Sequence, residues 1–178
     1  MLRAQREVNS AFTTHIQEDG LLYLTASSLS VPSLAHRFST RLGGVSRGVF
    51  AALNLGLHRG DSTENVQENY RRFCAVLGVA PQRCVLARQV HRDDVKVVTA
   101  QDAGAWLLRP QDYEADALVT NVPGLTLTIF SADCIPTLYF DPVTRCIGAA
   151  HAGWRGTALG IAAKTIAAME RLYGAKAE

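Results

Sequence analysis

The sequence predicts a layered α/β (α+β) fold in which helices pack on a mixed β-sheet. Apolar runs rich in β-branched residues recur between residues 84 and 151, and Asp, Asn, Gly or Pro bounds most of them, as is typical of strands. Two other segments, from 61 and from 153, carry apolar residues at helical spacing instead. The strand runs are partly continuous and partly alternating, which favours a mixed sheet over a purely parallel one.

The first third of the chain predicts two strands and one helix. Residues 21–29 are expected to form an early strand, and residues 34–48 a short strand that runs into a glycine-rich turn. The helix begins at a pattern of Asp61 with Glu64 that resembles a capping box, and Gly78 followed by Pro81 ends it. Its apolar stripe is Val66, Tyr70, Phe73 and Leu77.

The rest of the chain predicts a run of strands followed by a second helix. We expect strands within 84–91, 95–100, 115–121, 125–134, 136–141 and 145–151. The sequence GWRG then opens the second helix, with Thr157 as its expected cap. The expected apolar stripe of this helix is Leu159, Ala162, Ile166, Met169 and Tyr173.

Length and charge favour a single domain that acts on small molecules. A chain of 178 residues buries roughly 70% of its unfolded surface, so we expect one domain over 1–178. The 18 basic and 16 acidic residues give a net charge of +2 with no run of like charge, which argues against nucleic-acid and membrane partners. The N-terminal residues lack the apolar core of a signal peptide, so we expect a cytoplasmic protein.

Four cysteines occur without the CxxC spacing of a disulfide framework or a structural zinc site, so they are expected to be free thiols. Cys74, Cys84 and Cys146 are interpreted as inert core residues. Cys134 differs because polar residues precede it and Pro136 follows it, so we expect a functional role.

Three side chains follow predicted strands in the same way, namely His91, Cys134 and His151. If they converge, one thiolate and two imidazoles match a catalytic zinc site with three protein ligands and a fourth position for water. Zinc lowers the pKa of such a water to about 7. Four nearby aspartates are candidates to orient a histidine or to act as general acid or base: Asp93, Asp94, Asp116 and Asp133.

Two further segments are candidates for substrate binding. Arg155, in the turn HAGWRG, is a candidate phosphate ligand, or alternatively a solvated side chain stacked on Trp154. The irregular segment 36–61 is typical of a binding loop. Its candidate substrate ligands are His36, Arg41, Ser46, Asn54 and Arg59.

Several motifs, taken in order, resemble the YfiH-like family. They are HRFSTRLGGVSRGVFAALNLGLHRGD, RQVHRDDV, ADALVT, SADCIPTLYFDP and AAHAGWRGT. Its members are named variously as purine nucleoside phosphorylases, laccase-domain proteins and the peptidoglycan editing factor PgeF. The resemblance runs from about residue 35 to residue 173, and SADC with HAGWRG is specific to it.

The resemblance implies that His91, Cys134 and His151 are the metal-binding and catalytic triplet, usually with zinc. Of the nearby aspartates, we expect Asp116 and Asp133 to be further catalytic residues. It implies a fold similar to the catalytic domain of cytotoxic necrotizing factor. It also implies phosphorolysis of adenosine, inosine and methylthioadenosine, and deamination of adenosine. Family members extend beyond the point that corresponds to Glu178, so we expect a chain that lacks the family's usual C-terminal part.

Other functions stay open on the sequence. A metal-independent cysteine hydrolase or amidase, with Cys134 as nucleophile and a histidine as base, would fit the peptidoglycan-editing name. Five histidines are too few for a multicopper centre, but a single copper in the Cys-His-His site, with laccase-like polyphenol oxidase activity, is a further alternative. A non-catalytic interaction domain, without metal or nucleoside affinity, is the third.

Overall fold

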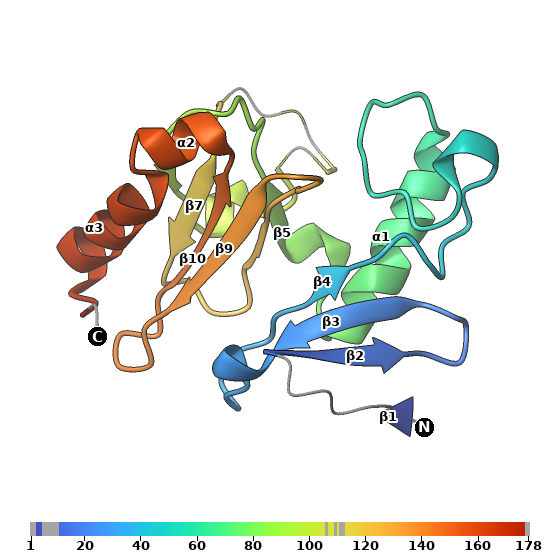
Figure 1. The fold of residues 1–178 in the computed structure, drawn as a ribbon, viewed down its shortest axis with the longest axis horizontal. Coiled ribbons are helices and arrows are strands. Elements are labelled where there is room, and N and C mark those ends of the chain that lie inside the picture. The colour runs from blue at the N-terminus through green and yellow to red at the C-terminus, as the bar shows by residue number, and fades with distance from the viewer. Residues whose placement is uncertain (1–2, 5–10, 106, 109, 111–112, 177–178) are drawn as a thin grey trace. The chain divides into compact units, whose positions relative to one another are not determined.

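The computed structural model describes residues 3–4, 11–105, 107–108, 110 and 113–176 (Figure 1). The chain divides into two compact units, residues 1–81 and residues 82–178. Among the described residues, no helix has both the length and the apolar character needed to cross a membrane. The expectation of a single domain stays a prediction.

The first unit contains an antiparallel sheet with the strand order β1-β2-β3-β4. The register pairs His15 with Tyr23 and Leu24 with Phe38. Strand β3 confirms the early strand predicted in 21–29, and β4 is the short strand before the glycine-rich turn. The strands are β1 (Arg3–Ala4), β2 (Phe12–Ile16), β3 (Leu22–Ala26) and β4 (Phe38–Ser39).

Helix α1 (Thr63–Leu77) completes the first unit and lies where the sequence predicts it. Its cap differs, because the Ser62 side chain accepts the hydrogen bond from the backbone N–H of Asn65, while Asp61 binds the preceding loop. Gly78 ends the helix in the left-handed conformation that glycine adopts without strain. One face of α1 contributes to a core built of Leu21, Tyr23, Leu53, Leu55, Phe73 and Val76.

The second unit contains the mixed sheet that the sequence predicts, and its strand order is β6-β7-β10-β9. Strands β5 and β8 form a separate parallel pair. Strands β6 and β7 run parallel, whereas β10 is antiparallel to both of its neighbours. The strands are β5 (Cys84–Leu86), β6 (Val95–Val97), β7 (Ala117–Thr120), β8 (Thr126–Thr128), β9 (Ile135–Phe140) and β10 (Ile147–Ala152).

The predicted second helix is two helices, α2 (Trp154–Ala158) and α3 (Ile161–Tyr173). Thr157 is not a cap, because it lies inside α2 and the cap residues are Gly153 and Gly160. Gly160 has a φ of 78°, which breaks the helix between the two parts. The buried residues of α3 are Ile161, Thr165, Ala168 and Met169, so Met169 is the one member of the predicted stripe that is buried, and Leu159 is exposed at the end of α2.

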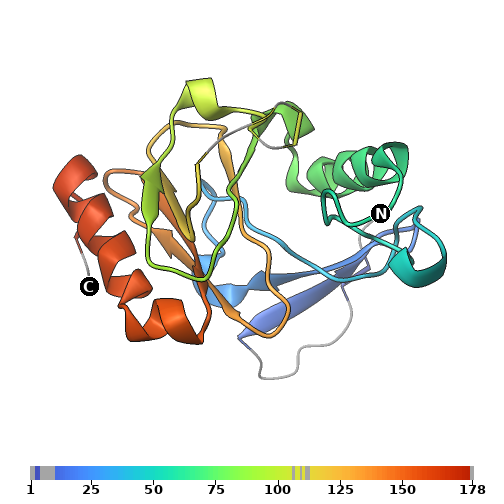
Figure 2. The ribbon, with the colours of Figure 1, turned by 90° about the horizontal axis from the view of Figure 1, so that it is seen from above.

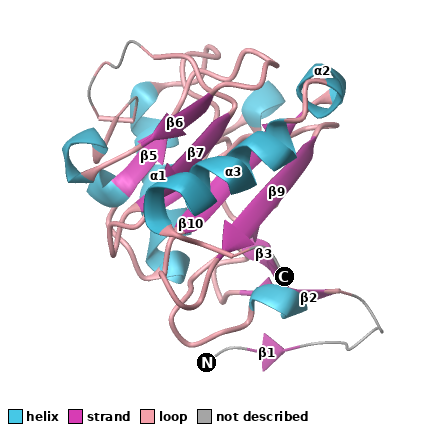
Figure 3. Ribbon diagram, turned by 90° about the vertical axis from the view of Figure 1, so that its left-hand side faces the viewer, coloured by secondary structure: helices cyan, strands magenta, loops and turns pink. Residues whose placement is uncertain are grey.

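Helix α3 covers one face of the mixed sheet (Figures 2 and 3). Ala117 and Val119 of β7 point to this face and pack with Ile161 and Met169 of the helix. Leu118 points to the other face and packs with Val85 of β5. Both sides of β7 are therefore buried, which explains its continuous apolar run. The part of the chain that the structure describes also forms four 3-10 helices: Ser27–Leu29, Gly48–Phe50, Pro81–Arg83 and Ala100–Asp102.

Candidate metal centre

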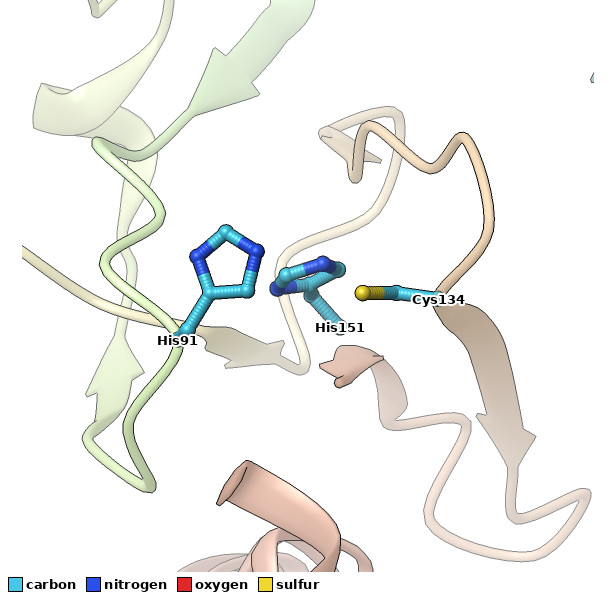
Figure 4. A group of neighbouring side chains, drawn as sticks. All are labelled: His91, Cys134 and His151. Carbon is cyan, nitrogen blue, oxygen red and sulfur yellow. The ribbon is translucent and has the colours of Figure 1, made fainter. Parts of the chain in front are cut away.

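Three side chains from distant positions of the second unit meet at one place. The ligand atoms of His91, Cys134 and His151 all lie within 4.8 Å of one another. The two imidazole rings meet edge to face, with centroids 4.7 Å apart. Figure 4 shows the two rings and the sulfur facing one another from three different segments. The structure thus brings together the triplet that the sequence singles out.

His91 lies in the loop between β5 and β6 and has a φ of 60°. Left-handed backbone is uncommon for a residue with a side chain, and other contacts must hold it there. The backbone N–H groups of Val90, His91 and Arg92 all donate to the carboxylate of Asp116, at 3.1, 2.9 and 2.9 Å. Asp116 therefore shapes the loop that presents His91.

Asp116 is fully buried and accepts a fourth hydrogen bond from the His151 ring. Burial alone would raise the pKa of this carboxyl group, but the hydrogen bonds from the backbone of Arg92, from His151 and from the other two amides outweigh it, so the pKa is lowered. The carboxylate is thus ionised and fully engaged. Of the two roles open for the aspartates, this geometry favours orientation of a histidine over proton transfer.

His151 lies on β10 and is 3% exposed. Its Nδ1 is 2.8 Å from Oδ1 of Asp116, so the proton sits on Nδ1. In the neutral ring, Nε2 is then the nitrogen whose lone pair is available to a metal. A carboxylate that binds one ring nitrogen of a histidine while the other binds a metal is a common arrangement in metal sites.

Cys134 lies in the turn before β9 and is half-buried, whereas Cys74, Cys84 and Cys146 are buried. The Ser131 hydroxyl donates to the Cys134 carbonyl and closes the turn. The carboxylate of Asp133 is 4.0 Å from the Cys134 sulfur, and Asp133 is exposed. Asp133 is therefore exposed to solvent beside the sulfur of Cys134.

Two glycines of the turn HAGWRG allow the backbone to approach the site. A Cβ atom on Gly153 would lie 3.1 Å from the Cys134 sulfur and 3.2 Å from Cδ2 of His91. A Cβ atom on Gly156 would lie 2.8 Å from the carbonyl oxygen of Arg92, in the loop that carries His91. Helix α2 therefore packs directly against the triplet.

The donor set of the triplet fits a metal ion. One thiol and two imidazoles are the ligands of catalytic zinc sites of the Cys-His-His type, and copper also binds such sets. The three atoms are close enough for one ion to reach all of them after small side-chain movements. His91 and Cys134 are partly accessible, so a fourth ligand has a route to the site.

The remaining predicted residues of the second unit lie around the triplet without joining it. Arg155 is exposed, and its guanidinium lies 5.5 Å from the centroid of the Trp154 ring, which is the stacked alternative. Asp93 forms an ion pair with Lys164 of α3. Asp94 lies 3.4 Å from Arg92 in another ion pair.

The candidate substrate residues of 36–61 belong to the first unit, where most of them make local hydrogen bonds. Ser46 and Asn54 both donate to Asp61, at 2.6 and 2.9 Å. Nε2 of His36 accepts from the backbone N–H of Ala26, and Arg41 donates to the carbonyl of Ala51. Arg59 is exposed. Their role in substrate binding stays a prediction.

Gln89, which the sequence did not single out, bonds the segment that leads to Cys134. Its side-chain amide makes two hydrogen bonds with the backbone of Phe130. The signal available in the sequence was its position, a polar residue inside the run that ends at His91.

Comparisons with known proteins show similarity in sequence over most of the chain. Residues 35–178 match the model of a family described as multi-copper polyphenol oxidoreductase laccase. The chain is 46% identical over 159 residues to a purine nucleoside phosphorylase of Deinococcus radiodurans, covering 89% of this chain and 57% of that one. It is 44% identical over 140 residues to a purine nucleoside phosphorylase of Corynebacterium glutamicum, covering 78% and 54%.

The fold is also similar to a solved structure. The crystal structure of the hypothetical protein YfiH of Bacillus licheniformis matches with a TM-score of 0.74 at 30% identity, covering 95% of this chain and 60% of that one. The chain thus spans about half to three fifths of the length of these relatives.

Proposed function

Because the chain belongs to the YfiH-like family, whose model is described as multi-copper polyphenol oxidoreductase laccase, we propose that it contributes a metal-dependent purine nucleoside phosphorylase site. The observation that carries the proposal is the convergence of His91, Cys134 and His151 within 4.8 Å. The names of the relatives support phosphorylase activity. Zinc is the proposed metal, with copper as the alternative.

In this proposal the protein's own residues prepare the site before substrate arrives. Nδ1 of His151 is tied to Asp116, which leaves Nε2 for the metal. His91 offers a ring nitrogen from a loop that Asp116 also holds, and Cys134 offers its sulfur as thiolate. When bound, the metal acts as a Lewis acid and lowers the pKa of a water in the open position.

The substrates are purine nucleosides and phosphate, specifically adenosine, inosine and methylthioadenosine, and adenosine deamination is a second reaction of the same site. Asp133 is the proposed proton carrier, because its carboxylate is exposed and close to Cys134, whereas Asp116 is fully bonded. Arg155 is the proposed phosphate ligand nearest in sequence to the triplet. The proposed substrate residues of the first unit are His36, Arg41, Ser46, Asn54 and Arg59.

One observation favours a second candidate function, a metal-independent cysteine hydrolase or amidase. His151 has a buried carboxylate on one ring nitrogen, and the Cys134 sulfur lies within 4.8 Å of its ligand nitrogen. A nucleophile, a histidine and an acid that orients the histidine form the general arrangement of such enzymes. Sensitivity to chelators separates the two functions, because the hydrolase would keep its activity without metal.

The test is a chromatographic assay of the zinc-loaded chain with adenosine or inosine, each with and without phosphate, and in chelator. Free base that requires phosphate and metal, and that is lost in Cys134→Ala, would support the phosphorylase. Inosine formed from adenosine would add the deaminase. Absence of free base and inosine under every condition would contradict both activities for this chain, and an amidase assay in chelator would then test the hydrolase.

A further inference from the structure

We propose that Gln89 is a positioning residue, which holds the segments of His91 and Cys134 at the spacing that a shared metal requires. Its Nε2 donates to the carbonyl oxygen of Phe130 at 2.8 Å, and its Oε1 accepts from the N–H of Phe130 at 2.7 Å. The inference rests on the proposed metal site, but not on the reaction catalysed there.

A side chain makes this link because the backbone after β5 no longer pairs with the segment after β8. Strand β5 pairs with β8 from Cys84–Leu86 to Thr126–Thr128. Beyond it, Arg88 bridges Glu114, and its carbonyl accepts from the N–H of Ala115. The carboxamide of Gln89 presents an N–H donor and a carbonyl acceptor side by side in one plane, so it continues the ladder as a peptide group would.

The link matters because Gln89 is two residues before His91 and Phe130 is four residues before Cys134. The hydrogen bonds of Asp116 connect the His91 loop with His151. The two bonds of Gln89 connect the same loop with the segment of Cys134. Together the two side chains fix all three ligands, and we infer that loss of the Gln89 bonds frees the cysteine segment from the histidine pair.

The test is Gln89→Met, which keeps the length and apolar contacts of the side chain but removes both hydrogen bonds. The matched control is Gln67→Met, at an exposed position of α1. Co²⁺ affinity is measured against a chromophoric chelator, and the thiolate-to-cobalt absorption band is recorded. Because supporting residues of metal sites contribute roughly 10- to 100-fold in affinity, we expect about a tenfold loss in Gln89→Met, a weaker band per bound ion, and no change in the control.

A role in general stability alone predicts a different result. The titrations are made well below the melting temperature of each metal-free protein, so that every variant is folded and only the site geometry can change the band. Gln89→Asn, whose amide is one carbon too short for both bonds, serves as the second variant and should lose affinity in the same direction. If both variants bind Co²⁺ with the affinity and the absorption band of the parent, the inference about Gln89 is overturned and the proposed metal site stands. If the parent does not bind Co²⁺, both the inference and the proposed metal site are overturned.

Discussion

At the scale of single residues, one carboxylate connects two of the three candidate ligands. Asp116 accepts three backbone N–H groups from the loop of His91 and one N–H from the ring of His151. Each carboxylate oxygen accepts two hydrogen bonds, so Asp116 has no lone pair left to take a proton from a substrate or a water. Its substitution should therefore change metal affinity and stability together.

Asp116→Asn tests this arrangement. One amide nitrogen would face backbone N–H groups, and buried donors without an acceptor cost about 1–3 kcal/mol each. We expect the free energy of unfolding to fall by about 2–4 kcal/mol and the metal affinity to fall roughly 10- to 100-fold, measured by urea denaturation and by chelator competition. Asp94→Asn is the control, since its carboxylate forms an exposed ion pair; equal losses in both variants would contradict the prediction.

Gly153→Ala changes the space beside the triplet without straining the backbone. Gly153 has a φ of −69°, which alanine adopts freely, but the new methyl group would lie 3.1 Å from the Cys134 sulfur. The sulfur or the His91 ring must then move by a few tenths of an ångström. We expect a melting temperature close to the parent's in chelator and a metal affinity at least several-fold lower. Thr157→Ala, on the exposed side of α2, should bind metal as the parent does.

At the scale of elements, the loop before α1 is attached to the helix through Asp61. The hydroxyl of Ser46 donates to it, as do the side chains of Asn54 and Asn65 and the backbone of Ser62. These bonds, that of Ser46 first, lower the pKa of Asp61 from 3.8 to about 2. The ionised form is thus favoured in the folded protein relative to the unfolded chain.

This shift predicts a loss of stability in acid. Because the folded pKa lies below the unfolded one, the contribution of Asp61 is present above about pH 4 and is lost as the pH falls toward 2. Urea denaturation between pH 5 and pH 2 should show a shallower acid loss in Asp61→Asn than in the parent. Parallel profiles of the two proteins would contradict the assignment. Glu68 also titrates in this range, but it is common to both proteins and cancels in the difference.

Some helices and strands could be predicted from the sequence alone, and others could not. The apolar periodicity predicted α1, the mixed sheet and the strands from β3 to β10, because burial of one or both faces leaves a regular pattern, but it did not predict β1 and β2. The division between α2 and α3 was missed because glycines provide both caps and leave no side-chain signature. The sequence singled out His91, Cys134 and His151 as residues that follow strands, but in the structure His91 lies in the loop after β5 and His151 lies within β10. The link from Gln89 was missed because it depends on pairing with Phe130, 41 residues away.

At the scale of the whole molecule, metal binding should couple to unfolding, because all three candidate ligands belong to residues 82–178. A ligand that binds only the folded state stabilises it by about 2.7 kcal/mol at a hundredfold excess over its Kd. For a chain of this length, that corresponds to a rise of roughly 5–10 °C in Tm. Zinc should produce this rise in the parent and not in Cys134→Ser, as measured by thermal melting.

The same coupling tests whether residues 1–178 form one domain. If the chain unfolds in a single cooperative step, metal bound in the second unit also slows every amide that exchanges only through global unfolding, including amides of α1 in the first unit. We therefore expect zinc to slow hydrogen exchange at the most protected amides of α1 and of α3 by the same factor. A slowing confined to residues 82–178 would contradict the single-domain prediction, because the first unit would then unfold while the metal stays bound.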